Sequence, residues 1–225
     1  MSGRMGIYSQ AAGGGFEFGN CLNGDGVNDF VLMDIPITIS TTSTISLWLN
    51  FNNTNFDGTY MGNSSSGSVA YRILSATKIR VYNGRSSDYT VPTMTTSSWY
   101  NIVISNTASG SRLYLNGVES SSGLLTNRPA TFNQLFKYST TSPQFILNAK
   151  YDEFGLLNGT SPTAQNITDL YNGGAGNDFT NVMGSSTLHY KFNETGTATT
   201  AVDSSGSGNN GTLNNFPTSG MWVSH

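Results

Sequence analysis

Short runs in which apolar and polar residues alternate recur along most of the chain. The clearest is 44–51, where small or polar residues alternate with large apolar ones. A period of two is that of a β-strand with one buried face. Runs of this kind, separated by Gly, Asn and Ser, occur at 29–33, 69–74, 78–82, 99–105, 111–115, 132–138, 145–157 and 188–192. Such regular short strands predict an all-β sandwich or barrel.

One segment has a helical pattern instead. Ser161 is a suitable N-cap, Pro162 suits the first helical position, and apolar residues are spaced three and four apart from Ile167 to Tyr171. The run 172–174 (NGG) then provides a stop signal. We therefore expect one short helix near 161–171, packed on the edge of the sandwich.

Composition favours a folded chain that contacts neither nucleic acid nor lipid. Charged residues are only 10% of the 225 residues, but aromatic residues are 12%, which disordered chains lack. The ten basic residues are scattered and the net charge is −3, so nucleic acid is not an expected partner. No apolar stretch reaches the length of about 18 residues that a membrane span needs, so no membrane insertion is expected. Cys21 is the single cysteine, which excludes an intrachain disulfide.

Five motifs occur in an order known from one superfamily. They are 23–31 (NGDGVNDFV), 44–49 (TISLWL), 99–104 (WYNIVI), 113–118 (LYLNGV) and 151–158 (YDEFGLLN). Together they resemble the bacterial and phage branch of the laminin-G-like, concanavalin A-like lectin jelly rolls, although Gly24 stands where that branch has an aromatic residue. The resemblance covers about residues 16–223 and implies a two-sheet antiparallel jelly-roll sandwich.

The C-terminal part departs from the usual order. The segments 189–194 (HYKFNE) and 203–213 (DSSGSGNNGTL) resemble the segment that usually opens these domains. Because the first and last strands of such jelly rolls lie side by side, a permuted order closes the same sheet. We expect one domain over 16–225, closed by a permuted C-terminal strand, with 1–15 as a flexible N-terminal arm; a truncated second copy is the alternative.

The acidic and histidine residues give no catalytic pattern. Glucanases with this fold use carboxylates on one face of a strand, usually as Glu-x-Asp-x-x-Glu, and this spacing is missing from the chain. Asp152 and Glu153 are adjacent in a predicted strand, so they should point to opposite faces. A Ser-His-Asp triad is equally unsupported, because His225 is at the end of the sequence and His189 is in a strand. The chain is not expected to be an enzyme.

Calcium is the best metal candidate. Asp152, Asp25 and Asp203 lie in motifs where the resemblance implies a structural Ca²⁺ near the sandwich edge, with Asp152 the first choice as ligand. Hard cations of this kind take oxygen ligands from irregular loops. The alternative is that these side chains cap turns by accepting backbone N–H groups.

Sugar binding would use aromatic faces together with amides that orient hydroxyl groups. Residues of suitable type in expected loops are Tyr60, Tyr82, Tyr89, Tyr100, Asn63 and Asn83. Trp48 and Trp99 are instead expected in the core.

These observations favour a non-enzymatic virion surface protein of a bacteriophage, such as a capsid decoration, head-fibre or tail component. Its partners would be other virion proteins or copies of itself, with cell-surface carbohydrate as a further contact. The fold is of an extracellular type, yet Met1 to Gly6 lack the apolar stretch of a secretory signal. The alternative is a carbohydrate-binding module or adhesin domain of a secreted, extracellular bacterial protein.

Overall fold

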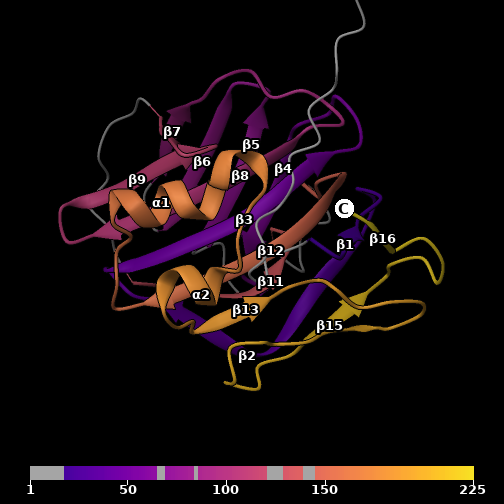
Figure 1. Ribbon diagram of the computed structural model, residues 1–225. Helices are drawn as coiled ribbons and strands as arrows, with labels where there is room; N and C mark the ends of the chain where they lie inside the picture. Colours follow the sequence, from indigo (N-terminus) through magenta and orange to yellow (C-terminus); the bar gives the residue numbers. More distant parts are fainter. Residues whose placement is uncertain (1–17, 65–68, 84–85, 121–128, 139–144) are drawn as a thin grey trace, which may run out of the picture.

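The computed structural model describes residues 18–64, 69–83, 86–120, 129–138 and 145–225. In this part of the chain the strands form two antiparallel sheets of eight strands each, stacked face to face (Figure 1). The predicted all-β jelly-roll sandwich is therefore confirmed. The predicted arm, 1–15, lies outside the described residues.

Sheet A carries the helices on its outer face. In spatial order it contains β10 (Val118–Glu119), β9 (Gly110–Leu115), β8 (Trp99–Thr107), β3 (Ser43–Phe51), β12 (Ala149–Asn158), β1 (Asn20–Asn23) and β16 (Trp222–Ser224), and β13 (Leu188–Tyr190) also pairs with β12. The partner of β12 on that side thus changes along its length: β1 pairs with Lys150 and Tyr151, and β13 pairs with Phe154 to Leu156.

Sheet B forms the other layer. In spatial order it contains β14 (Thr200–Ala201), β15 (Gly211–Asn214), β2 (Phe30–Ile39), β11 (Ala130–Leu135), β4 (Gly58–Gly62), β5 (Val69–Ser75), β6 (Lys78–Asn83) and β7 (Ser86–Thr90). Strands β5, β6 and β7 follow one another as a meander, so their registers are fixed by short connections.

The main core lies between the two sheets. In β3 the alternation predicted from the sequence places Leu47 and Leu49 in this core, whereas Trp48 and Asn50 belong to the opposite face. Sheet B contributes large side chains such as Tyr60 and Tyr71, both fully buried. Burial of this apolar area, at about 25 cal/mol per Å², drives the pairing of the two layers.

The helix near 161–171 exists, but it begins later than predicted. Helix α1 (Ala164–Tyr171) has Thr163 as N-cap, and Thr163 and Asn166 form a reciprocal capping box. The prediction of Ser161 as N-cap was wrong, because the Ser161 hydroxyl donates to the carbonyl of Asn106 in β8. Asn172 ends the helix in a left-handed conformation, as its stop signal indicated.

Two further short helical segments follow α1. They are η1 (Asn172–Gly174) and α2 (Phe179–Met183). Both α-helices lie over the outer face of sheet A (Figure 1), where a second apolar cluster contains Val103, Leu157, Ile167, Leu170 and Phe179. Among the described residues, neither helix is long and apolar enough to cross a bilayer.

The C-terminal segment returns to the N-terminal strands. Strand β16 pairs with β1, and β15 pairs with β2. The segment between β13 and β15, which is rich in Gly, Ser and Asn, is held by Asp203, whose carboxylate accepts backbone N–H bonds from His189, Ser205 and Asn209.

Two predicted strand boundaries were wrong for the same reason. Strand β12 begins at Ala149 rather than at 145, and β11 ends at Leu135 rather than at 138. Phe145 and Phe136 adopt φ of 70° and 74°. This left-handed conformation interrupts a ladder, and an apolar residue type gives no sign of it in the sequence.

Replacement of Gly155 by alanine tests how tightly α2 is packed on sheet A. A Cβ at this position would lie 2.1 Å from the ring of Phe179. We expect Gly155→Ala to lower the free energy of unfolding by about 1–3 kcal/mol, the usual cost of overpacking, as measured by urea denaturation. Combination with Phe179→Leu should recover part of this loss; an equal loss in the single and double variants would contradict the close packing.

Candidate functional site

A groove on the outer face of sheet B gathers basic and aromatic side chains. Tyr71, Ile73, Ile79 and Val81 point into the core, so the alternate residues of β5 and β6 point outward. The resulting cavity has a volume of about 240 Å³ and is lined by Arg72, Arg80, Tyr82, Ser86 and Tyr138. We call it the sheet B groove.

Ion pairs hold the two arginines of the sheet B groove in place. Arg72 and Arg80 are directly opposite one another across β5 and β6, an arrangement of like charges that is unfavourable. Asp88 relieves it with two bonds to Arg80, of 2.6 and 3.0 Å, and Asp57 contacts Arg72 at 2.5 Å. The hydrogen bond from Arg80 lowers the pKa of Asp88 below its usual value. The groove is thus polar with its main charges balanced.

The tyrosines of the sheet B groove remain available for contact. Tyr82 and Tyr138 are both half-buried, and within the described part of the chain neither hydroxyl has a hydrogen-bond partner. Arg72 lies over the ring of Phe145, with its Cζ 3.5 Å from the ring centroid. Aromatic faces beside fixed hydrogen-bonding groups suit a hydroxylated ligand with an apolar face.

A second cavity lies at one end of sheet A. It has a volume of about 370 Å³ and is lined by Asn50, Phe51, Asn52, Ser97, Trp99, Lys150, Ser224 and His225. We call it the sheet A pocket. The imidazole of His225 stacks between Trp99 and Phe18, at centroid distances of 3.9 and 3.7 Å. Trp99 was predicted in the core and is instead half-buried in this pocket, whereas Trp48 is buried as predicted.

Asp152 and His225 form a pair below the sheet A pocket. His225 Nδ1 lies 2.8 Å from Asp152 Oδ2, and Asp152 is 1% exposed. Burial, with Glu153 as a second cause, raises the pKa of Asp152 to about 9. Burial, with the charge of Lys150 as a second cause, lowers the pKa of His225 to about 4. The pair therefore shares one proton and is neutral overall.

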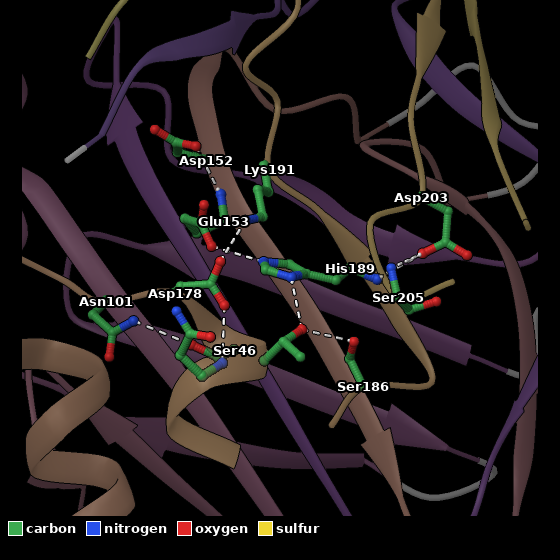
Figure 2. Close-up of polar contacts among 12 residues, drawn as sticks. Ser46, Asn101, Asp152, Glu153, Asp178, Ser186, His189, Lys191, Asp203 and Ser205 are labelled. Carbon is green, nitrogen blue, oxygen red and sulfur yellow. Dashed lines mark hydrogen bonds and ion pairs between the residues drawn. The ribbon is translucent and has the colours of Figure 1, made fainter. Parts of the chain in front are cut away.

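Glu153 lies on the same face of sheet A as Asp152. The prediction that these neighbours point to opposite faces was wrong, because the register shifts between Asp152 and Gly155 and Glu153 adopts φ of 46°. Such a bulge re-aims side chains. Figure 2 shows Glu153 next to His189 and Asp178, and Asp178 is the N-cap of α2. A positive φ at a glutamate leaves no sign in the sequence.

The cluster around Glu153 is closed by contacts within the protein. His189 is fully buried, with Nε2 2.7 Å from Glu153 Oε2 and Nδ1 3.0 Å from Thr180 Oγ1 (Figure 2). Lys191 Nζ lies 2.5 Å from Asp178 Oδ2. The Glu153, His189 and Thr180 connectivity resembles a catalytic relay, but the two cavities described above are lined by other residues, and buried His189 offers a substrate no approach.

The structure does not bring the three predicted metal ligands together. Among the described residues, the one group of His, Cys, Asp and Glu side chains close enough to share an ion is Glu153, Asp178 and His189. Asp152 contacts His225, and exposed Asp25 accepts from the backbone N–H of Val27. Calcium at any one of the predicted ligands stays a prediction.

Asp25 and Asp203 act locally as turn residues. Both oxygens of Asp203 accept backbone N–H bonds, which is the turn-capping role given as the alternative. Beside Asp25 lies Asp29, which the sequence did not single out. Asp29 is 1% exposed, and burial raises its pKa to about 6.

The tyrosines proposed for sugar contact separate into two groups. Tyr82 lines the sheet B groove. The prediction was wrong for Tyr60, Tyr89 and Tyr100, which are 0%, 1% and 8% exposed and belong to strands. Asn63 is also buried, and the side chain of Asn83 lies outside the described part of the chain. Tyr138, not predicted, was identifiable in the sequence as a tyrosine at the end of an expected strand.

The two antiparallel sheets, stacked face to face, place the chain in the class of jelly-roll sandwiches with a lectin-like fold. The model of the concanavalin A-like lectin/glucanases superfamily matches residues 24–168, and the chain belongs to this superfamily. Comparison with curated protein sequences gives no match.

Solved structures share this fold at low sequence identity. One is a candidate carbohydrate-binding protein from Bacteroides ovatus, with a TM-score of 0.64 and 17% identity over 88% of this chain; the match spans 59% of that protein. Another is the heptameric SAP-like pentraxin of Limulus polyphemus, with a TM-score of 0.53 and 8% identity over 68% of this chain and 81% of the pentraxin chain.

The Asp152–His225 pair makes stability depend on pH. Between pH 6.5 and 9 the folded pair keeps one proton that the separated side chains of the unfolded chain have lost. The free energy of unfolding should therefore fall as pH rises through this range, by up to about 1.4 kcal/mol per pH unit. Urea denaturation at a series of pH values measures this slope. Asp152→Asn should remove this slope, since Asn does not titrate; an unchanged slope would assign it to other groups.

Proposed function

We propose that the chain is a non-catalytic glycan-binding module and that the sheet B groove binds the glycan. The observation that carries the proposal is the row of Arg72, Arg80 and Asp88, flanked by the half-buried rings of Tyr82 and Tyr138. Fixed ion pairs provide oriented donors and acceptors for sugar hydroxyls, and the rings provide surfaces for the apolar face of a sugar.

The charge balance favours an uncharged glycan. Each arginine of the sheet B groove already faces a carboxylate. An anionic sugar would have to displace that carboxylate, whereas a hydroxyl group bonds to the remaining donors and acceptors without breaking the ion pair.

Two observations support a binding rather than a catalytic role. The adjacent carboxylates Asp152 and Glu153 are 1% and 2% exposed, and each is paired with a histidine. Neither is accessible to a glycosidic bond. The Bacteroides ovatus protein that shares the fold is itself named for carbohydrate binding, which agrees with the proposal.

Replacement of Tyr82 tests the sheet B groove. The full chain should bind neutral oligosaccharides on a glycan array without hydrolysing them, and Tyr82→Ala should weaken binding of the best ligand by about tenfold, the equivalent of about 1.4 kcal/mol, in isothermal titration calorimetry. Tyr114→Ala is the matched control, because Tyr114 is a half-buried tyrosine of β9 in sheet A. Equal losses in both variants, or release of reducing sugars, would count against the proposal.

We also propose that the module is carried on the surface of a bacteriophage virion, where its partners are virion proteins or copies of itself. The support is the low content of charged residues, the composition rich in Asn, Thr and Gly, and the glycine-rich segment 11–15. A secreted extracellular bacterial protein is the alternative carrier, and both carriers would present the sheet B groove to cell-surface carbohydrate.

Removal of residues 1–15 tests the virion assignment. The shortened chain should keep its melting temperature, because the described residues form a closed core without this segment. It should no longer be incorporated into virus particles, which mass spectrometry of purified virions would measure. Loss of folding would show that 1–15 belong to the core, and full incorporation would show that they do not dock.

A further inference from the structure

The sheet A pocket is built on a row of three unlike side chains. Lys150, Asn50 and Trp99 occupy directly opposed positions on β12, β3 and β8. Their neighbours Tyr151, Leu49 and Tyr100 belong to the main core, so the row lies on the outer face of sheet A. Directly opposed residues have Cβ atoms only about 5 Å apart. A cation, an amide and an indole therefore share one rigid wall.

The polar groups of this row have no partners in the described part of the chain. Asn50 is 8% exposed, yet its side-chain amide makes no hydrogen bond there. The amide of Asn50 is reached from the pocket, so its donor and acceptor atoms are free to bond to water or to a ligand. Lys150 is half-buried and forms no ion pair among the described residues. Both groups line the sheet A pocket.

The pocket favours a negatively charged ligand. The nearest buried acid, Asp152, is already paired with His225, and a pair that shares one proton is neutral whichever member holds it. The charge of Lys150 is thus left without compensation from that pair. The pKa of the His225 imidazole is lowered first by burial and second by the positive charge of Lys150.

The volume and the lining of the sheet A pocket indicate an organic ligand rather than a simple inorganic anion. The volume of about 370 Å³ falls in the range of about 300–1,000 Å³ that organic ligands occupy. Trp99, with His225 stacked on it, adds an apolar aromatic wall. Trp99 also has an indole N–H for which the described residues provide no acceptor.

We propose that the sheet A pocket is a second binding site, for a sugar that carries a carboxylate. Lys150 would bind the carboxylate, the amide of Asn50 would bind ring hydroxyls, and Trp99 would contact the apolar face of the sugar. This site is on the opposite sheet from the sheet B groove and does not depend on it.

The test compares three ligands on the full chain by isothermal titration calorimetry. Glucuronate has both the ring and the carboxylate, glucose lacks the carboxylate, and acetate lacks the ring. We expect glucuronate to bind at least about tenfold more tightly than either of the others. Lys150→Met should abolish that preference. Lys137→Met is the matched control, because Lys137 is a half-buried lysine that lies over the ring of Phe30.

Two outcomes would overturn this proposal. Acetate binding as tightly as glucuronate would reveal a site for small anions only, and glucuronate binding unchanged by Lys150→Met would place the ligand elsewhere. Circular dichroism of each variant checks its fold. Tyr82→Ala separates the two sites, because it should weaken neutral glycans at the sheet B groove and leave glucuronate binding unchanged; loss of both ligands in that variant would contradict two independent sites.

Discussion

Glu153 holds a left-handed backbone conformation in the middle of β12, and the arrangement of sheet A depends on it. A non-glycine residue in this conformation costs about 1–2 kcal/mol. The bulge lies where the neighbour of β12 changes from β1 to β13. It also turns Glu153 toward the face that already holds Asp152. Two buried acids are thereby placed side by side on the outer face of sheet A, where they need partners that balance or share their charge.

Histidines from the C-terminal segment are those partners. His189 contacts Glu153, and His225 contacts Asp152. The residues that pair with the acids of β12 thus come from β13, which completes the sheet, and from the position directly after β16. Charge pairing and strand pairing support each other here, which explains how a poor position for a carboxylate is retained.

The sequence predicts the layers of this fold better than its site. Alternation in β3 and the Asn-Gly turn between β9 and β10 depend on neighbours in the chain, and both are found in the structure: Asn116 and Gly117 have positive φ, as such a turn requires. The row of Lys150, Asn50 and Trp99 joins three strands far apart in sequence. Only the register between those strands reveals it, and no local pattern carries register. The bulge at Glu153 was missed for a related reason, since tertiary contacts impose it.

The adjacency of β1 and β16 has a mechanical consequence. The backbone N–H of His225 donates to the carbonyl of Gly19, so the chain enters and leaves the sandwich at one point. Any polypeptide joined before β1 and after β16 would therefore leave the domain from neighbouring points. Tension along such a chain would first separate β16, the edge strand, from β1, while the sheet B groove, formed by other strands, would stay intact until this pair had opened.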